Sequence, residues 1–505
     1  MLKYTKNYLF GGIKMSKKPS PNIENGIKRN ILVFISLLFI LFFRFIPGPA
    51  GLSASAMQVL GVFIGVLILW LSISIDWPSL LALAGLSLVP EISFNSMLAG
   101  SIGGSTFSFL LFTFLCTYAL SQTSFVRRCA VGFITSRFAK RGPWWFLISY
   151  CASVLIIGLV MSPTVLYVIY LPILDEICRV LELKKDDKLA NGLVIGQTIS
   201  CALSSGMTPI AHVFGIMAMG FYEAATGNTI SYGAYMGFGI PVGLICFGAM
   251  ILIFKIFLRP DMSKFSSIDM SSLKKDIEPM DLRERLILII FFAVVALWVL
   301  PGFIEPVMPT VAKYINSKGT AFPPLLGAVA LFIITIKGKP LLKFGDAMSK
   351  GVSWGSLIMT ASTLAIGSAM TSKDIGLTEW LTTNISPMLN GLSPLLLVFI
   401  FTIWAAVQTN LSSNMVTITV VCAVAIPICI ASNGIISTPA VAAIIGMMGA
   451  FAFATPPAHP NVALASASGW TTTGQMMRYG LAIMIIAVIV TVFVGYPIAT
   501  ALMGY

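Results

Sequence analysis

The sequence predicts an all-α polytopic membrane protein with two inverted-topology repeats, each of about five transmembrane helices and one re-entrant hairpin, plus an extra N-terminal helix. The 505 residues are 57% hydrophobic and only 10% charged, against about 25% charged residues in soluble domains. Apolar stretches of membrane length recur along the chain. A pentapeptide that holds both histidines occurs twice, as Thr208-Pro209-Ile210-Ala211-His212 and as Thr455-Pro456-Pro457-Ala458-His459.

The chain is basic, with a formal net charge of +13. The lysines and arginines cluster in short connections between apolar spans, as the positive-inside rule expects. We therefore expect the lipid bilayer as a partner and no nucleic acid. The eight cysteines lie mostly in apolar runs and form no CxxC pair. They predict neither a disulfide framework nor a metal site, apart from any Na⁺ held by oxygen ligands.

Residues 1–30 are rich in lysine and predict a basic cytoplasmic tail, and residues 31–50 predict the first transmembrane helix. The apolar run begins too far from Met1 for a cleavable signal peptide. Met15 is an alternative start, because the residues before it have no evident structural task. With the tail inside, the basic connections after later spans also fall inside, which predicts a multi-pass plasma-membrane protein with a cytoplasmic N-terminus.

A charged stretch at 259–285 divides the chain and predicts a cytoplasmic linker. The first repeat is expected at 51–258 and the second at 286–505. Because five crossings are an odd number, the second repeat would enter the membrane in the opposite orientation. The expected apolar spans are 57–75, 78–91, 105–123, 192–222 and 234–258, then 286–303, 322–336, 353–371, 440–467 and 478–503.

Short matches in the same order support the two repeats. They are Trp77-Pro78 with Phe322-Pro323, Ser121 before Phe125 with Thr371 before Leu377, Leu171-Pro172-Ile173 with Ile426-Pro427-Ile428, and, more loosely, Tyr235-Met236-Gly237 with Met477-Arg478-Tyr479-Gly480.

The two Thr-Pro steps interrupt apolar spans. Proline removes a helical hydrogen bond that lipid cannot replace, so each break is expected to line an enclosed or watery cavity. Each histidine is either a proton carrier or ligand, or a group whose hydrogen bonds fix the break. The substrate-contact candidates here are Thr208, Pro209, Thr455 and Pro456, with His212 and His459 in a second rank. The nearby glycines expected to serve close helix packing are Gly206, Gly215, Gly446 and Gly449.

The hairpins are predicted near 145–175 and 394–431, where polar residues interrupt apolar ones. Their tips are Ser162-Pro163-Thr164 and the stretch from Thr409 to Asn414. Hydroxyls, an amide and free carbonyls suit Na⁺, while helix N-termini favour an anion. The alternative is that Ser and Thr merely bond to their own helices. The substrate candidates are Ser162, Thr164, Ser413 and Asn414, and the cation candidates are Ser162, Ser412, Asn414 and Thr417.

In these motifs the chain resembles the divalent anion:sodium symporter family, which comprises the sodium-dicarboxylate, citrate and sulfate carriers. The family carries a Ser-Asn-Thr tip in each repeat and a Gly-Thr-Pro-Pro-Asn break downstream. The tips here read Ser162-Pro163-Thr164 and Ser413-Asn414-Met415, with Thr417-Ile418-Thr419 as a rival register for the second. The resemblance implies Na⁺ at the tips, substrate carboxylates held by tips and breaks, an elevator-like movement and a homodimer.

Four positions depart from the family pattern: Pro163, Met415, Ala211 and Ala458. The sequence predicts a secondary active transporter that couples the movement of a small organic or inorganic anion to Na⁺. The di- or tricarboxylate class is the preferred substrate. A Na⁺-independent anion exchanger of the same fold is the alternative, because Pro163 replaces a Na⁺-binding asparagine of the family. A channel is a further alternative. An intramembrane enzyme is disfavoured, since neither histidine segment contains Asp, Glu or Cys.

Overall fold

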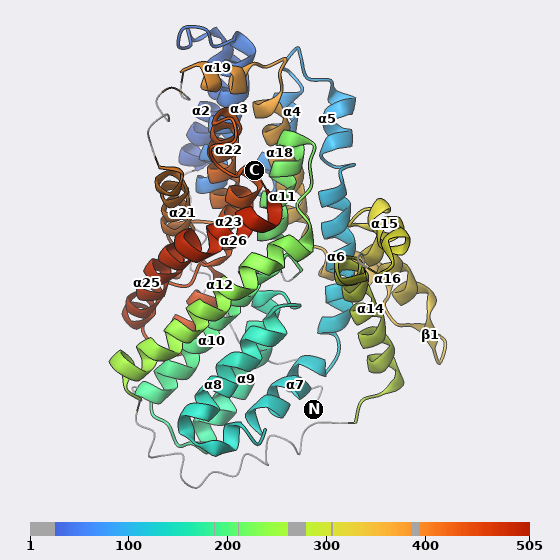
Figure 1. Cartoon of the computed structure of the whole chain (residues 1–505), viewed down its shortest axis with the longest axis vertical. Helices are drawn as coiled ribbons and strands as arrows, with labels where there is room; N and C mark the ends of the chain where they lie inside the picture. Colours follow the sequence, from blue (N-terminus) through green and yellow to red (C-terminus); the bar gives the residue numbers. More distant parts are fainter. Residues whose placement is uncertain are drawn as a thin grey trace.

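The computed structural model describes residues 26–185, 187–210, 212–260, 279–304, 307–384, 387 and 393–504. These residues form helices, apart from a two-stranded antiparallel ribbon of β1 (Thr335–Ile336) and β2 (Lys339–Pro340). Most of the predicted tail, most of the linker and the alternative start at Met15 lie outside the described residues. Figure 1 shows the helices packed in one elongated bundle, with α14, α15, α16 and β1 along one side.

The first half of the chain begins with α2 and η1, which cover the end of the predicted tail and most of the predicted first span. Helix α2 (Gly26–Phe42) starts before residue 31, so Lys28 and Arg29 lie within its first turns. The following elements are η1 (Phe43–Phe45), α3 (Ala54–Ser72), α4 (Trp77–Leu86), α5 (Phe94–Gly100), α6 (Ser105–Ser121), α7 (Phe125–Ile134), η2 (Ala139–Arg141), α8 (Pro143–Gly158), α9 (Pro163–Val180), α10 (Lys188–Met207), α11 (Val213–Thr226), α12 (Tyr232–Ile253) and η3 (Phe254–Leu258).

The second half begins at Leu282, before the predicted boundary at residue 286. Its elements are α14 (Leu282–Ile304), α15 (Pro309–Ser317), α16 (Phe322–Ile333), the ribbon, α17 (Phe344–Asp346), η5 (Ala347–Gly351), α18 (Trp354–Thr371), α19 (Leu377–Asn384), α21 (Pro394–Leu411), α22 (Asn414–Ala431), α23 (Thr438–Ala450), α24 (Pro460–Ala467), α25 (Thr473–Val490), η6 (Thr491–Gly495) and α26 (Tyr496–Met503).

The two halves present the same order of elements. Helices α4 and α16 both carry proline in their first turn. Helix α6 is bent by 45° from α5, and α18 is bent by 68° from α17 and η5. A short helix, α7 or α19, then precedes a helix pair, a broken helix and a long final helix. The helix pairs α8–α9 and α21–α22 lie where the sequence predicts hairpins.

Length and composition identify five helices in the described part of the chain that are long and apolar enough to span a membrane, or seven if each bent pair is one span. Several other predicted crossings consist of shorter apolar helices, and two of them are divided by a Thr-Pro step. The predicted span 192–222 is thus α10 plus α11, and 440–467 is α23 plus α24. The chain is a multi-pass membrane protein.

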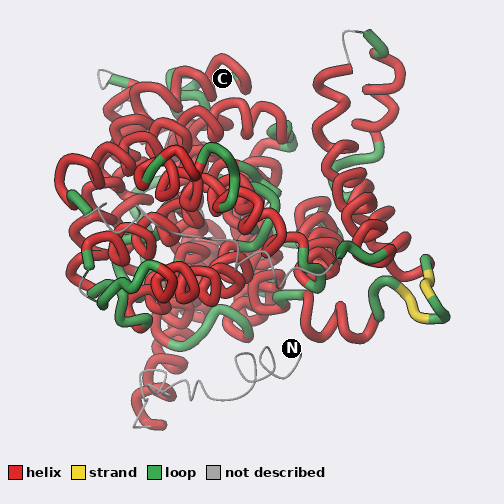
Figure 2. Tube along the Cα trace, turned by 90° about the horizontal axis from the view of Figure 1, so that it is seen from below, coloured by secondary structure: helices red, strands yellow, loops and turns green. Residues whose placement is uncertain are grey.

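The buried core follows the broken helices. Helix α11 packs against α18, α22 and α23, and α10 packs against α8, α9 and α12. In Figure 1, α8 and α9 lie in the lower part of the molecule and α21 and α22 in the upper part, so the two predicted hairpins lie toward opposite ends. Figure 2 shows the yellow strands at one edge, away from this centre.

Candidate functional site

The two hairpin tips have nearly the same backbone. Ser162 is the N-cap of α9 with φ −56° and ψ 129°, and Ser413 is the N-cap of α22 with φ −61° and ψ 130°. Neither serine side chain caps its helix, although Ser is a preferred N-cap residue whose oxygen usually accepts a first-turn N–H. Both hydroxyls, and the first-turn N–H groups near them, are therefore available to a ligand.

The threonines of both breaks hold their own hairpins. The Thr208 hydroxyl donates a hydrogen bond of 2.6 Å to the carbonyl of Leu159, which follows α8. The Thr455 hydroxyl donates to the carbonyl of Asn410, near the end of α21. Each hydroxyl hydrogen is thus used inside the protein, so either threonine can face a ligand only with its oxygen lone pairs.

Asn410 fixes the second break through its side-chain amide. Its Nδ2 donates to the carbonyls of Ala406 and Phe451, at 2.9 and 3.0 Å. Its Oδ1 accepts the backbone N–H groups of Phe453 and Ala454, at 3.1 and 2.9 Å. The unwound backbone of the break has lost its helical partners, and this amide replaces them.

Asn414 is the first residue of α22, and its side-chain amide, unlike that of Asn410, makes no hydrogen bond with the described residues. The residue is only 3% exposed, yet neither Nδ2 nor Oδ1 has a hydrogen-bond partner among the described residues. Burying an amide without partners costs about 1–3 kcal/mol. An unsatisfied buried amide at a hairpin tip therefore makes Asn414 a candidate ligand-binding residue.

The two histidines occupy equivalent positions, as N-cap residues of α11 and α24. Helices α10 and α11, which flank the first break, both pack against α23, which precedes the second, so the two breaks lie close together. His459 Nδ1 accepts the backbone N–H of Asn461 at 3.2 Å and so caps α24. The His212 ring instead lies against the ring of Phe214, with centroids 3.9 Å apart and planes tilted by 38°, and its Nδ1 has no partner in the described part of the chain.

Glycines allow the helices around the breaks to approach closely. A Cβ on Gly446 would lie 3.0 Å from Cα of Gly215, and one on Gly206 would lie 3.0 Å from the Met447 carbonyl oxygen. A Cβ on Gly449 would lie 2.4 Å from Cγ1 of Ile418. The packing role predicted for these four glycines is confirmed.

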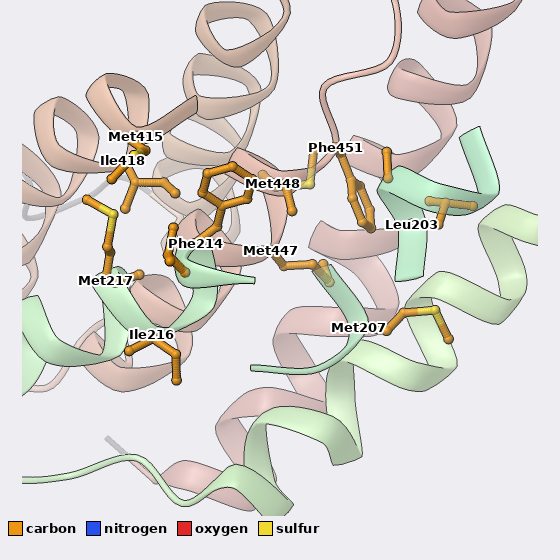
Figure 3. Packing of buried hydrophobic residues seen from close by; sticks show 14 of the residues in the cluster. Leu203, Met207, Phe214, Ile216, Met217, Met415, Ile418, Met447, Met448 and Phe451 are labelled. Carbon is orange, nitrogen blue, oxygen red and sulfur yellow. The ribbon is translucent and has the colours of Figure 1, made fainter. Parts of the chain in front are cut away.

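Figure 3 shows the apolar groups that these glycines leave in contact. Met415 and Ile418 of α22 lie beside Met217 and Phe214 of α11, and Phe451 lies beside Leu203 of α10. The second tip is thereby packed against the helix that follows the first break.

One weak sequence match is wrong. The sequence pairs Gly237 with Gly480, but the structure makes Gly239 the counterpart of Gly480. A Cβ on Gly239 would lie 2.8 Å from the carbonyl oxygen of Met207, and one on Gly480 would lie 2.6 Å from Cα of Ala454. Met207 and Ala454 each precede the threonine of a break, so each glycine admits the backbone just before it unwinds.

The structure also brings together residues that the sequence did not connect. Asn461 of α24 donates from Nδ2 to the carbonyl of Pro163 at the first tip, at 3.2 Å. The Cys201 thiol of α10 donates to the same carbonyl at 3.1 Å. The only sequence signal for Asn461 is a polar residue directly after Pro460 at a helix start, which by itself does not identify a site.

The remaining candidates have ordinary helix contacts. Ser412 Oγ donates to the Gln408 carbonyl and Thr417 Oγ1 to the Ser413 carbonyl, at 3.0 and 3.1 Å. These are the bonds of hydroxyl groups to their own helix that the alternative reading expects. Pro209 and Pro456 lie within the breaks, and Thr164 lies in the first turn of α9. Ala211, in the first break, lies outside the described residues.

A cavity of about 540 Å³ lies elsewhere, between α5, α6, α11 and α18. Glu91 and Glu223 line it together with several serines, and Ser105 Oγ donates to Glu223 Oε1 at 2.8 Å. None of the site residues predicted from the sequence lines this cavity.

Comparison with known proteins gives a consistent result. The family model of the sodium:sulfate symporter transmembrane region matches residues 27–504. The chain is 24% identical to the sodium-dependent dicarboxylate transporter SdcS of Staphylococcus saprophyticus, over 94% of this chain and 92% of that protein. It is also 24% identical to an uncharacterised transporter of Haemophilus influenzae, over 66% of this chain and 69% of the other.

A solved structure shares the fold. The YdaH transporter of Alcanivorax borkumensis superposes with a TM-score of 0.56 at 12% identity, covering 80% of this chain and 89% of that one. Because the family model spans nearly the whole chain and the relatives are transporters, not enzymes, this protein belongs to the sodium:sulfate symporter family of membrane transporters.

Proposed function

We propose that this protein is a secondary active transporter that couples the movement of a small anion, of the di- or tricarboxylate class, to Na⁺. The single observation that carries the proposal is Asn414, a buried amide with both polar atoms unpartnered at the second hairpin tip. Its Nδ2 is a donor suited to a carboxylate, and its Oδ1 is a ligand suited to Na⁺. One side chain thus offers a contact to each transported species.

The anion has further partners at the tips. Helices α9 and α22 both begin at a serine that does not cap its helix, so the positive ends of their dipoles are open to a carboxylate. Two such ends, one from each repeat, suit a substrate with two negative groups. The candidate substrate contacts are Ser162, Thr164, Ser413 and Asn414, with Thr208, Pro209, Thr455 and Pro456 at the breaks.

Sodium would be held by oxygen atoms of the same tips. The unpartnered Oδ1 of Asn414 fits this use, and the hydroxyls of Ser162, Ser412 and Thr417 have lone pairs to offer. A bound cation would neutralise part of the substrate charge, and in this way the two species would favour each other's binding.

The arrangement of helices supports an elevator-type movement in which the tips travel together. Gln197 of α10 joins both arms of the first hairpin: its Oε1 accepts from Tyr150 of α8, and its Nε2 donates to the Tyr167 carbonyl of α9 at 3.3 Å. Asn410 joins α21 to the second break in the same way. The hairpins and broken helices would therefore move as one body past the helices around α14 and α16.

Four further assignments belong to the same proposal. The repeats occupy 51–258 and 286–505 in opposite orientations, the protein lies in the plasma membrane, the N-terminus is cytoplasmic, and the transporter is a homodimer. The charge pattern supports the orientation, and the motif resemblance supports the dimer.

The experiment is uptake into proteoliposomes of labelled succinate, citrate, sulfate and a monocarboxylate, with and without an inward Na⁺ gradient. Uptake of a dicarboxylate or citrate that rises with the Na⁺ gradient is expected. Saturable uptake that ignores Na⁺ would overturn the coupling, and flux without counterflow would indicate a channel.

A specific residue favours a second candidate, the Na⁺-independent exchanger. Pro163 stands where the family has a tip asparagine, so the first tip lacks its own side-chain amide. An exchanger would require anion inside the vesicles and would be indifferent to Na⁺ outside, which the same assay measures by loading vesicles with unlabelled substrate.

A further inference from the structure

Pro163 leaves the first tip without two groups that the second tip has. Asn414 follows Ser413 and provides both a side-chain amide and a backbone N–H, whereas Pro163 follows Ser162 and provides neither. The backbone angles of the two serines agree closely, so the chain enters both helices in the same conformation, with a different residue at the first helical position.

An amide from the other repeat reaches this place. Asn461 Nδ2 lies 3.2 Å from the Pro163 carbonyl oxygen and 3.5 Å from the Cys201 sulfur. The Asn461 backbone N–H is held by His459 Nδ1, so the residue is fixed at the start of α24.

The other end of the Asn461 amide is unused. The residue is 2% exposed and its Oδ1 has no partner among the residues that the structure describes. The carboxylate groups of a substrate offer acceptor oxygens only, so they cannot satisfy an acceptor. A cation can, and the free hydroxyl of Ser162 stands next to Pro163 in the chain to provide a further oxygen ligand.

We propose that Asn461 supplies, from the second repeat, the amide that Pro163 removes from the first hairpin tip, and that its Oδ1 is a ligand for Na⁺ at that tip. This inference rests on the proposed Na⁺ coupling and adds to it a ligand that crosses between the repeats. It also accounts for the presence of proline at the tip without loss of a cation site there.

The test is cation binding by the purified full-length protein, measured as the Na⁺-dependent rise in Tm at constant ionic strength, with K⁺ as the replacing ion. Binding to the folded state stabilises it by RT ln(1 + [Na⁺]/Kd), so the dependence of Tm on Na⁺ concentration reports the apparent affinity. N461A is expected to weaken the apparent Na⁺ affinity by about tenfold or more, because a buried ligand to a charged group is lost. N461D, which keeps an acceptor oxygen at the same position, is expected to bind Na⁺ more tightly than N461A does.

The matched control is N191A. Asn191 of α10 is also 2% exposed with an unpartnered Oδ1 in the described structure. It lies ten residues before Cys201 on α10, about 15 Å along the helix. N191A is expected to keep the wild-type Na⁺ affinity even if its Tm without Na⁺ falls.

If Asn461 has only a structural role, N461D is expected to show no improvement in Na⁺ binding over N461A. A carboxylate beside the Pro163 carbonyl would repel it, so N461D would be as poor as N461A in Tm and would gain nothing from Na⁺. That result, or an unchanged Na⁺ affinity in N461A, overturns the role of Asn461 and leaves Na⁺ coupling intact. A wild-type protein with no Na⁺-dependent Tm shift would overturn both proposals.

Discussion

Asn410 and Asn414 are four positions apart and almost equally buried, but their side-chain amides differ in their hydrogen-bond partners. The Asn410 side chain makes four hydrogen bonds with backbone groups and holds the second break. Asn414 makes none with the described residues. Side chains of the same chemistry at nearly the same depth thus divide into one that maintains the structure and one that is available to a ligand.

This contrast gives a paired prediction. N410A should leave the N–H groups of Phe453 and Ala454 unsatisfied, at about 1–3 kcal/mol each, and lower Tm strongly. N414A should leave Tm unchanged or raised, because it removes an unsatisfied amide, while it abolishes uptake. Tm in detergent and uptake in proteoliposomes measure the two effects. Normal uptake by N414A would remove Asn414 from the site.

His459 provides a second test at the residue scale. Its Nδ1 caps α24, and loss of an N-cap costs about 1 kcal/mol. H459A should lower Tm accordingly, and H459N, which retains a capping acceptor, should restore Tm and transport. If H459N instead keeps its stability but loses the pH dependence of uptake, His459 is a proton carrier and not only a cap.

At the scale of elements, the two halves build their breaks with equivalent contacts. Thr208 and Thr455 each bond to a carbonyl at the end of the preceding hairpin arm. Gly239 and Gly480 each admit the backbone before the break. The two halves make these contacts with different neighbouring residues. We infer that both halves maintain the geometry of the break.

The contact of α11 with α23 depends on one glycine. The Cβ of G446A would lie 2.9 Å from Ala218 Cβ and 3.0 Å from Gly215 Cα, which is backbone and cannot turn aside. G446A should therefore destabilise the protein by about 1–3 kcal/mol. The control is G248A in α12, where a Cβ meets nothing within 4 Å. Equal Tm values for the two variants would show that the helices separate without cost.

At the scale of the whole molecule, the proposed movement requires α11 to shift against α6. Ser105 of α6 and Glu223 of α11 are hydrogen-bonded in this structure. A cysteine pair, S105C with E223C, joined by a short cleavable thiol crosslinker should arrest uptake, and cleavage of the linker should restore it. Each single variant serves as control. Full uptake by the crosslinked protein would mean that α6 and α11 move together and that the moving boundary lies elsewhere.

The sequence by itself determined the membrane class, the order of the repeated elements, and the positions of the first tip and of both breaks, while it left two registers open for the second tip, which the structure places at Ser413. These features are local, because apolar span length, proline and glycine act on their own stretch of chain. It could not determine which polar groups are free. The Thr208 and Thr455 hydroxyls are used inside the protein, Gly239 replaces Gly237 as the partner of Gly480, and Asn461 reaches Pro163 from the other half. Such contacts depend on how helices far apart in the chain pack together, and only the tertiary structure decides that.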